Sequence, residues 1–205
     1  MKTKMIFTTM AAAALLSACS ETDAPSTPQP TYDRYVDARE AAARIVGGNQ
    51  ALPTNDRVTM NGAYEIISSD LLGTDSIVGQ VRMTADFGNE SVSGSLHNNY
   101  VDQDGSAEQL EGVVTFSGDI ENGTSMVAHG DGILTTVDDQ DYDMFVDLSG
   151  SFGNSSSSGV NITDGELTGN INVLDDGSGL LYDVMAGSEF DVAECLPAPV
   201  ENCTP

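Results

Sequence analysis

Three carboxylates recur at every second position of one segment, as Asp139, Asp141 and Asp143. Oxygen ligands at this spacing begin a calcium-binding loop of the EF-hand type. Such a loop has Gly at its sixth position and Glu at its twelfth, whereas this chain has Met144 and Gly150 there. Because alternate residues of a strand share one face, the carboxylates also fit a solvated row, the interpretation that we favour. They remain weak candidates for a Ca²⁺ site, and we expect no other cofactor.

The other reactive side chains form no pattern typical of an enzyme. His97 and His129 are the only histidines, and neither has a partner at the spacing of a metal motif or a catalytic triad. The four consecutive serines at 155–158 lack the strained elbow and the base that a nucleophilic serine needs. We therefore expect that the chain is not an enzyme.

Cys19 has the clearest chemistry of any residue in the chain. It follows Leu16-Ser17-Ala18, after a lysine-bearing start and an apolar stretch that is too short to span a bilayer. This pattern resembles the bacterial lipobox. The resemblance implies that residues 1–18 are a signal peptide, cut before Cys19, and that the thiol and the freed amine are acylated, which anchors the protein to a membrane. Ser20, where inner-membrane lipoproteins often have Asp, favours the outer membrane.

Cys195 and Cys203 are the two other cysteines. Exported compartments are oxidising, and seven residues separate the two thiols, so we expect a small disulfide loop that holds the tail of residues 196–205. A zinc site is not expected, because no histidine or further cysteine lies near them.

The charge balance is strongly acidic, with 7 Lys+Arg against 32 Asp+Glu and a net charge of −25. No Lys or Arg follows Arg82. A field of this sign repels phosphate, so nucleic acid is excluded as a partner. The acids are spread along the chain, which favours a general surface adaptation to salty surroundings; a partner of basic character is the alternative.

Two short segments lead from the anchor to the main domain. Residues 19–30 contain three prolines and almost no apolar side chain, as expected of an extended tether. Residues 31–47 have the pattern of a short helix that Gly47-Gly48 ends. We expect one face of this helix to lie against the main domain, formed by Tyr32, Tyr35, Val36, Ala42, Ala43 and Val46.

Residues 54–195 form the predicted main domain. From Val58 onward its longest runs alternate apolar and polar side chains, as in strands with one buried and one wet face. The strands expected are 58–67, 77–87, 91–96, 112–118, 124–130, 133–137, 142–152, 167–174 and 181–190. A bend rather than a turn at 130–132 reduces them to eight. Short antiparallel strands without helical crossovers predict a soluble, all-β, up-and-down barrel of eight strands. A β-sandwich is the alternative. The absence of Trp and of aromatic girdles favours a soluble barrel over one that spans a membrane.

Two pairs are expected to make tight turns, Gly88-Asn89 as a two-residue loop and Asn122-Gly123. The first lies within residues 83–96, Met-Thr-Ala-Asp-Phe-Gly-Asn-Glu-Ser-Val-Ser-Gly-Ser-Leu. This stretch resembles the strand–turn–strand signature of the β-barrel of transferrin-binding protein B, a family of lipid-anchored surface proteins of Gram-negative bacteria. Its matching residues are Asp86, Phe87, Gly88, Asn89 and Gly94. We expect Gly94 to relieve a crowded barrel wall.

A second stretch, Gly150-Ser151-Phe152-Gly153, resembles the signature that precedes the closing strands of that family. The chain departs from the family at residues 154–159, Asn-Ser-Ser-Ser-Ser-Gly, and has one barrel rather than two lobes with handle domains. Transferrin binding is therefore not inferred. The resemblance implies a lipid-anchored cell-envelope protein, on the cell surface, that binds a protein or a small ligand. The alternative is an accessory or structural outer-membrane lipoprotein with no specific ligand.

Overall fold

The computed structural model describes residues 50–68, 76–103, 106–155, 159–174, 181–184 and 187–194. The predicted signal peptide, tether, helix of 31–47 and tail of 196–205 lie outside the described residues, as do Cys19, Cys195 and Cys203. Within the described ranges the regular structure is entirely β-strand, and no helix there is long and apolar enough to cross a membrane.

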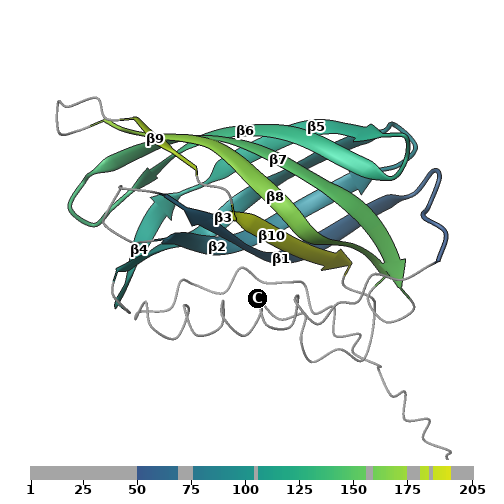
Figure 1. Ribbon diagram of the computed structural model, residues 1–205, viewed down its shortest axis with the longest axis horizontal. Helices are drawn as coiled ribbons and strands as arrows, with labels where there is room; N and C mark the ends of the chain where they lie inside the picture. The colour runs from purple at the N-terminus through teal and green to yellow at the C-terminus, as the bar shows by residue number, and fades with distance from the viewer. Residues whose placement is uncertain are drawn as a thin grey trace, which may run out of the picture.

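The strands form one antiparallel sheet (Figure 1). They are β1 (Arg57–Ile67), β2 (Ser76–Asp86), β3 (Ser91–Gln103), β4 (Ser106–Gly112), β5 (Val114–Glu121), β6 (Ser125–Thr135), β7 (Asp141–Ser155), β8 (Gly159–Val173), β9 (Leu181–Asp183) and β10 (Glu189–Glu194). The predicted all-β class is confirmed.

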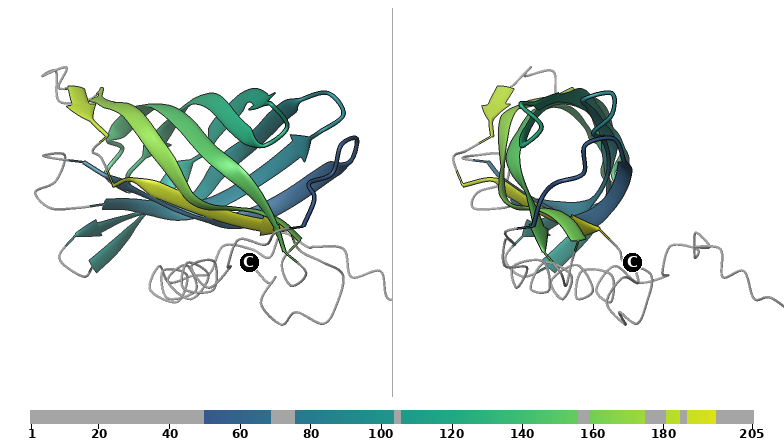
Figure 2. Two further views of the ribbon diagram at one scale, coloured as in Figure 1. Left: turned by 45° about the vertical axis from the view of Figure 1, so that its right-hand side comes forward. Right: turned by 90° about the vertical axis from the view of Figure 1, so that its right-hand side faces the viewer.

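The sheet closes on itself because β10 pairs with both β1 and β8. Strands β4 and β5 lie end to end along β3, separated by Val113, and β9 and β10 lie end to end along β8. The result is a ring of eight strands, which Figure 2 shows from its end. The predicted number of eight is confirmed. The β-sandwich alternative is wrong, since one sheet curls round rather than two sheets packing face to face.

Alternation decides which side chains enter the ring. In β7, Tyr142, Met144, Val146 and Leu148 are buried, whereas Phe145 and Asp147 between them are exposed. The inward side chains of all the long strands join in one hydrophobic cluster. Its largest members include Tyr64, Tyr142, Phe190, Met60, Met83, Met126 and Leu148. The interior is therefore filled by side chains, and burial of this cluster is what holds the ring together.

Several stretches of strand differ from the prediction. The strand predicted at 91–96 continues to Gln103 as β3, and the strand predicted at 181–190 is divided into β9 and β10. The strand β4 and the first half of β8 are absent from the prediction. The sequence of β4, Ser-Ala-Glu-Gln-Leu-Glu-Gly, is polar and has weak strand propensity, which predicts a connection rather than a strand. It forms a strand because it pairs with β3 on one side and β6 on the other. The first half of β8 is likewise absent from the predicted strands; it pairs with β7 and β10 and buries Val160 and Ile162.

The two predicted turns have different outcomes. Asn122 and Gly123 have φ of 52° and 68°. Two left-handed residues in a row are what a tight turn of this kind requires, so this prediction is confirmed. The two-residue loop at Gly88-Asn89 is wrong. The turn spans residues 87–90, and its left-handed residue is Glu90, with φ of 52°.

Candidate binding surface

The two motif stretches meet at one end of the ring. The rings of Phe87 and Phe152 contact edge to face, with centroids 5.1 Å apart and an interplanar angle of 61°. Both side chains are buried, so each closes the apolar interior at this end. The two phenylalanines belong to separate motifs in the sequence, and the fold makes them one packing unit.

Asp86 organises the turn that follows it. The Asn89 backbone N–H donates to Asp86 Oδ1 at 3.0 Å, and the Asn89 side-chain amide donates to Oδ2 at 2.9 Å. Arg57 Nη2 also donates to Oδ2, at 2.9 Å. The Asn89 amides foremost, and then Arg57, hold the pKa of Asp86 below its usual value. These contacts explain Asp86 and Asn89 as structural residues of the turn.

The glycines of the two motifs make room for inward side chains. A Cβ at Gly94 would lie 2.9 Å from Cε2 of Phe116 and closer still to the carbonyl oxygen of Arg82. The crowding predicted at Gly94 is therefore confirmed. A Cβ at Gly150 would lie 2.7 Å from Cγ2 of Ile162. Gly153 lies one residue beyond Phe152, paired with Asn161 of β8.

The three aspartates considered for calcium do not form one row. Asp139 lies in the connection before β7, with φ of 63°, whereas Asp141 and Asp143 lie in the strand. Asp141 accepts a hydrogen bond from the Thr135 hydroxyl at 2.6 Å. Among the described residues, no group of three or more His, Cys, Asp or Glu side chains is close enough to hold a metal ion.

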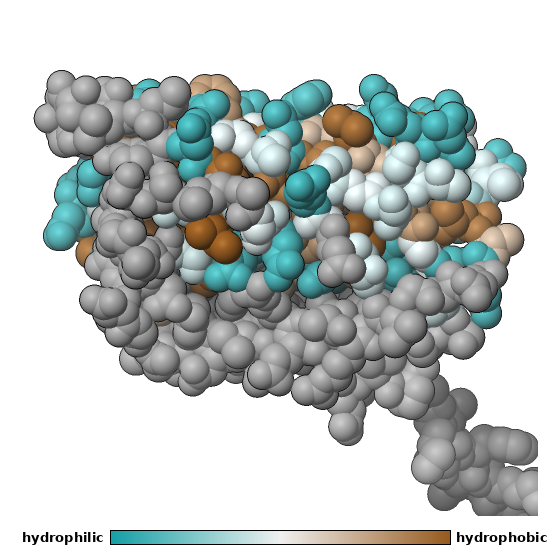
Figure 3. All heavy atoms as spheres, viewed as in Figure 1, coloured by the Kyte–Doolittle hydropathy of each residue, from teal (hydrophilic) through white to brown (hydrophobic). Residues whose placement is uncertain are grey.

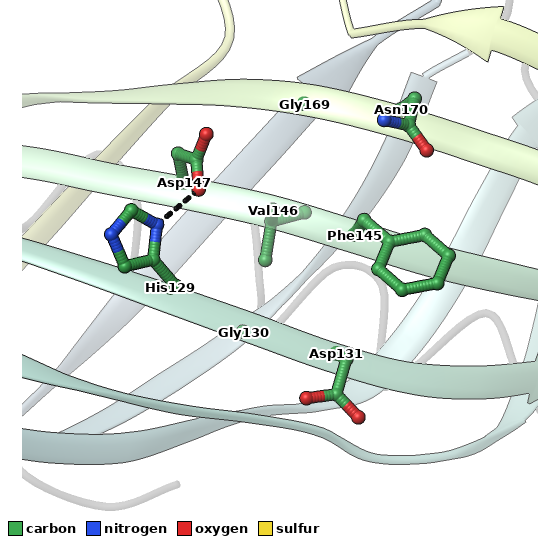
Figure 4. Close-up of a pocket in the computed structure, with 8 residues that line it drawn as sticks. All are labelled: His129, Gly130, Asp131, Phe145, Val146, Asp147, Gly169 and Asn170. Atoms are coloured by element: carbon green, nitrogen blue, oxygen red, sulfur yellow. Dashed lines mark hydrogen bonds and ion pairs between the residues drawn. The ribbon is translucent and has the colours of Figure 1, made fainter.

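A shallow hollow of about 260 Å³ lies on the outer surface of β6, β7 and β8 (Figure 4). Its floor is the row Gly130, Val146 and Gly169, which are paired across the three strands and send no side chain outward. Outward side chains border the floor on two sides: His129 and Asp147 on one, and Asp131, Phe145 and Asn170 on the other. We call this area the β6–β8 wall.

His129 and Asp147 are directly opposite each other on β6 and β7, and the His129 Nδ1 to Asp147 Oδ1 distance is 2.5 Å. Nothing in the sequence indicates this partner, because the residues are 18 positions apart. Their side chains are 73% and 57% exposed. A polar contact as open to water as this contributes little to stability. It does fix the orientation of the imidazole at the border of the hollow.

Carboxylates and exposed apolar side chains alternate across the next two rows of the wall. Asp131 on β6 faces Phe145 on β7, and Ile133 on β6 faces Asp143 on β7. Phe145 and Ile133 are 45% and 48% exposed. Exposed apolar side chains that gather on one surface are typical of an interaction site. We call these four residues the checkerboard. Each apolar side chain has a carboxylate across from it and another two positions along its own strand.

The charge around the checkerboard is of one sign. From Ser106 to Leu174 the sequence has twelve Asp+Glu and no Lys or Arg. The arginines of the described residues, Arg57 and Arg82, lie on β1 and β2, across the ring from β6 and β7. Nothing basic within the described part of β4–β8 except His129 offsets the carboxylates.

A scan against protein-family models and searches of curated proteins and of solved structures find no match to this chain. The resemblance to transferrin-binding protein B therefore stays a prediction.

Proposed function

We propose that the chain is a lipid-anchored cell-envelope binding protein, held at the outer membrane by Cys19, that uses the β6–β8 wall to bind a basic protein segment. In this proposal the ring is a soluble up-and-down β-barrel similar to that of transferrin-binding protein B-like lipoproteins. An accessory or structural lipoprotein with no specific ligand is the alternative, and it is an outcome of the tests below.

The distribution of side chains supports a soluble barrel. The interior is apolar, while outward positions such as Asp131, Asp143 and Asp147 are acidic. A membrane-spanning barrel has the reverse arrangement, with an apolar outer band and a polar lumen. On the face shown in Figure 3, hydrophobic side chains are interspersed with hydrophilic ones rather than gathered in a continuous band.

The checkerboard is the single observation that carries the binding proposal. An Arg or Lys side chain has an apolar stem and a charged head, so it matches a surface on which apolar and carboxylate groups alternate. A guanidinium over the Phe145 ring also gains a cation–π contact while it bonds to Asp131. The absence of Lys and Arg from Ser106 to Leu174 leaves these carboxylates open to a partner's cations.

A peptide of matched geometry tests the proposal. Residues two apart on a strand share a face and lie about 6.8 Å apart, so Arg-Ser-Leu-Ser-Arg-Ser-Leu-Ser presents alternating cations and apolar groups to the wall. Arg-Leu-Ser-Ser-Arg-Leu-Ser-Ser has the same composition but divides the two kinds between opposite faces. Fluorescence anisotropy with the mature lipidated chain in phosphatidylcholine vesicles should show tighter binding of the first peptide.

Charge-neutral variants give the matched control. Asp131→Asn/Asp143→Asn removes the checkerboard carboxylates, and Asp56→Asn/Asp119→Asn removes two exposed carboxylates elsewhere. We expect only the first variant to abolish the preference for the first peptide. Equal loss in both variants would mean general charge attraction. Equal binding of the two peptides, together with capture of no partner at physiological salt, would favour the accessory lipoprotein.

The anchor is tested separately. Radiolabelled palmitate should label the wild-type chain and not Cys19→Ser, and only the wild type should remain with the outer-membrane fraction. Protease treatment of intact cells should then remove the domain if it lies on the cell surface. Cleavage only after permeabilisation of the outer membrane would exclude a surface receptor.

A further inference from the structure

A second part of the outer surface, on β1, β2 and β3, is apolar and buried. Ala63, Val78 and Tyr100 form a cluster of their own, separate from the core, with exposures of 2%, 2% and 1%. Ala107 of β4 packs against them. We call this group the outer cluster.

Strand alternation shows that the outer cluster points away from the interior. Tyr64 and Ile66, on either side of Glu65, belong to the core, so Ala63 faces outward. Ile77 belongs to the core as well, and Val78 therefore also faces outward, opposite Tyr100 in the register. By contrast, the outward apolar side chains Ile133 of β6 and Phe145 of β7 are 48% and 45% exposed.

The surroundings of the outer cluster are also removed from water. His97 lies opposite Gln80 on the same outer surface, and its Nδ1 is buried with no hydrogen-bond partner among the described residues. Burial lowers the pKa of His97, and Arg82 adds to the effect. A sheet surface with small neighbours such as Ala63 and Ala107 cannot exclude water from a tyrosine by itself. Another part of the chain has to cover it.

We infer that residues 31–47 dock as an amphipathic helix across the outer cluster, running along the outside of β1–β3. The segment supplies an apolar face at helical spacing that includes Tyr32, Tyr35 and Val36.

The length of the segment places its aromatic residues at the same distance from the end of the ring as the outer cluster. The Gln50 N–H donates to the carbonyl oxygen of Asn154, so the chain enters at the end of the ring where β7 finishes and β1 begins. Along β1, Ala63 lies six residues beyond Arg57, which is about 20 Å along the strand. A helix that runs back from Gly47 reaches Tyr35 after twelve residues, about 18 Å. The aromatic end of the segment therefore comes to lie over the outer cluster.

With the helix docked here, the arginines and the acidic β6–β8 wall lie on opposite sides of the molecule. Three of the five arginines that follow Cys19 lie in residues 31–47, and Arg57 and Arg82 lie on the strands beneath. The β6–β8 wall is on the opposite side of the ring. Together with the proposed anchor at Cys19, docking turns the acidic wall away from the lipid. The docking itself does not depend on the proposed function.

Tyrosine nitration of the mature full-length chain tests the docking. Ala43→Glu places a carboxylate on the apolar face of the segment, whereas Ala41→Glu makes the same change on the opposite face. With tetranitromethane, Tyr100 should be unreactive in the wild type and in Ala41→Glu, and its nitration should rise about tenfold in Ala43→Glu as the helix leaves. Tyr64 and Tyr142, inside the ring, should stay unreactive in all three. Protection of Tyr100 in Ala43→Glu, or equal reactivity in both variants, would overturn the inference.

If Ala43→Glu unfolds the ring, Tyr64 becomes reactive as well and nitration no longer reports on the docking. Photo-crosslinking then tests the docking without that substitution. Tyr35→p-benzoylphenylalanine in the otherwise wild-type chain should form an intramolecular link to peptides of β2 or β3 that contain Val78 or Tyr100. A link to β5–β8, or none, contradicts the docking. Such a result would assign the cover to Leu71-Leu72 of the β1–β2 connection or to the tail of residues 196–205.

Discussion

Gly94 is the position at which the packing of the ring is most open to a decisive test. A Cβ there would meet Cε2 of Phe116 at 2.9 Å and would press on the carbonyl oxygen of Arg82, which the β2–β3 pairing holds in place. The ring of Phe116 is buried and has core on its other side. Gly94→Ala therefore has to displace both an aromatic ring and a backbone, and overpacking of this kind costs about 1–3 kcal/mol.

For a domain of this length, 1 kcal/mol shifts Tm by about 2–4 °C, so a cost of about 1–3 kcal/mol should make Gly94→Ala unfold about 2–12 °C below the wild type in a thermal melt followed by circular dichroism. Gly88→Ala is the matched control, because its nearest neighbour, Asn55 O at 3.3 Å, would have to move by only a few tenths of an ångström, and Gly88 is not in the left-handed region. It should melt within a degree or two of the wild type.

Phe116→Leu shortens the side chain over Gly94, and the double variant Gly94→Ala/Phe116→Leu should recover part of the loss. Recovery should be incomplete, since the Arg82 carbonyl stays in place. Equal melting temperatures for Gly94→Ala and Gly88→Ala would refute the packing described for β2, β3 and β5.

Three further changes have defined outcomes. Phe152→Ala removes a buried ring and its edge contact to Phe87. It should lower the free energy of unfolding in a urea titration by about 3–5 kcal/mol, and a loss below about 1 kcal/mol would contradict the closure of the interior at this end. Gly123→Ala puts a Cβ in open space on a residue with φ of 68°. Backbone strain alone should then cost about 1 kcal/mol, while Thr124→Ala beside it should be nearly neutral in the same titration. The pKa of His97 is lowered in the folded state, so below its ordinary value the unfolded chain binds a proton that the folded chain does not. Stability should fall as the pH drops from neutral through about 6.5, and His97→Gln should reduce this dependence. An unchanged pH profile in His97→Gln would mean that His97 is not desolvated.

Most of the strands and their inward side chains can be predicted from the alternation of apolar and polar residues. In β7 the inward residues Tyr142, Met144 and Leu148 can be assigned from the sequence, because each strand must bury one face. The eight strands follow from the same pattern. The strand β4 could not be predicted, because its polar sequence is held by pairing with β3 and β6 and not by its own propensity.

The candidate site was harder to predict because it depends on register. Asp131 lies across from Phe145, and His129 across from Asp147, only because β6 and β7 pair at one particular offset. One signal was present in the sequence: Phe145 falls on the polar side of the β7 alternation, where a large apolar residue has no structural reason to be. An outward aromatic among aspartates was the available indication of a binding surface.

The most direct test of the binding proposal is therefore the contribution of the Phe145 side chain. We predict that Phe145→Ala weakens binding of Arg-Ser-Leu-Ser-Arg-Ser-Leu-Ser to the mature chain about tenfold, or about 1.4 kcal/mol, since it removes the aromatic surface and leaves the charge unchanged. Val127→Ala is the control, because it shortens an exposed apolar side chain of β6 that lies outside the checkerboard. This variant should bind the peptide as tightly as the wild type does. Equal affinity of Phe145→Ala and the wild type would contradict the claim that the checkerboard is a binding site.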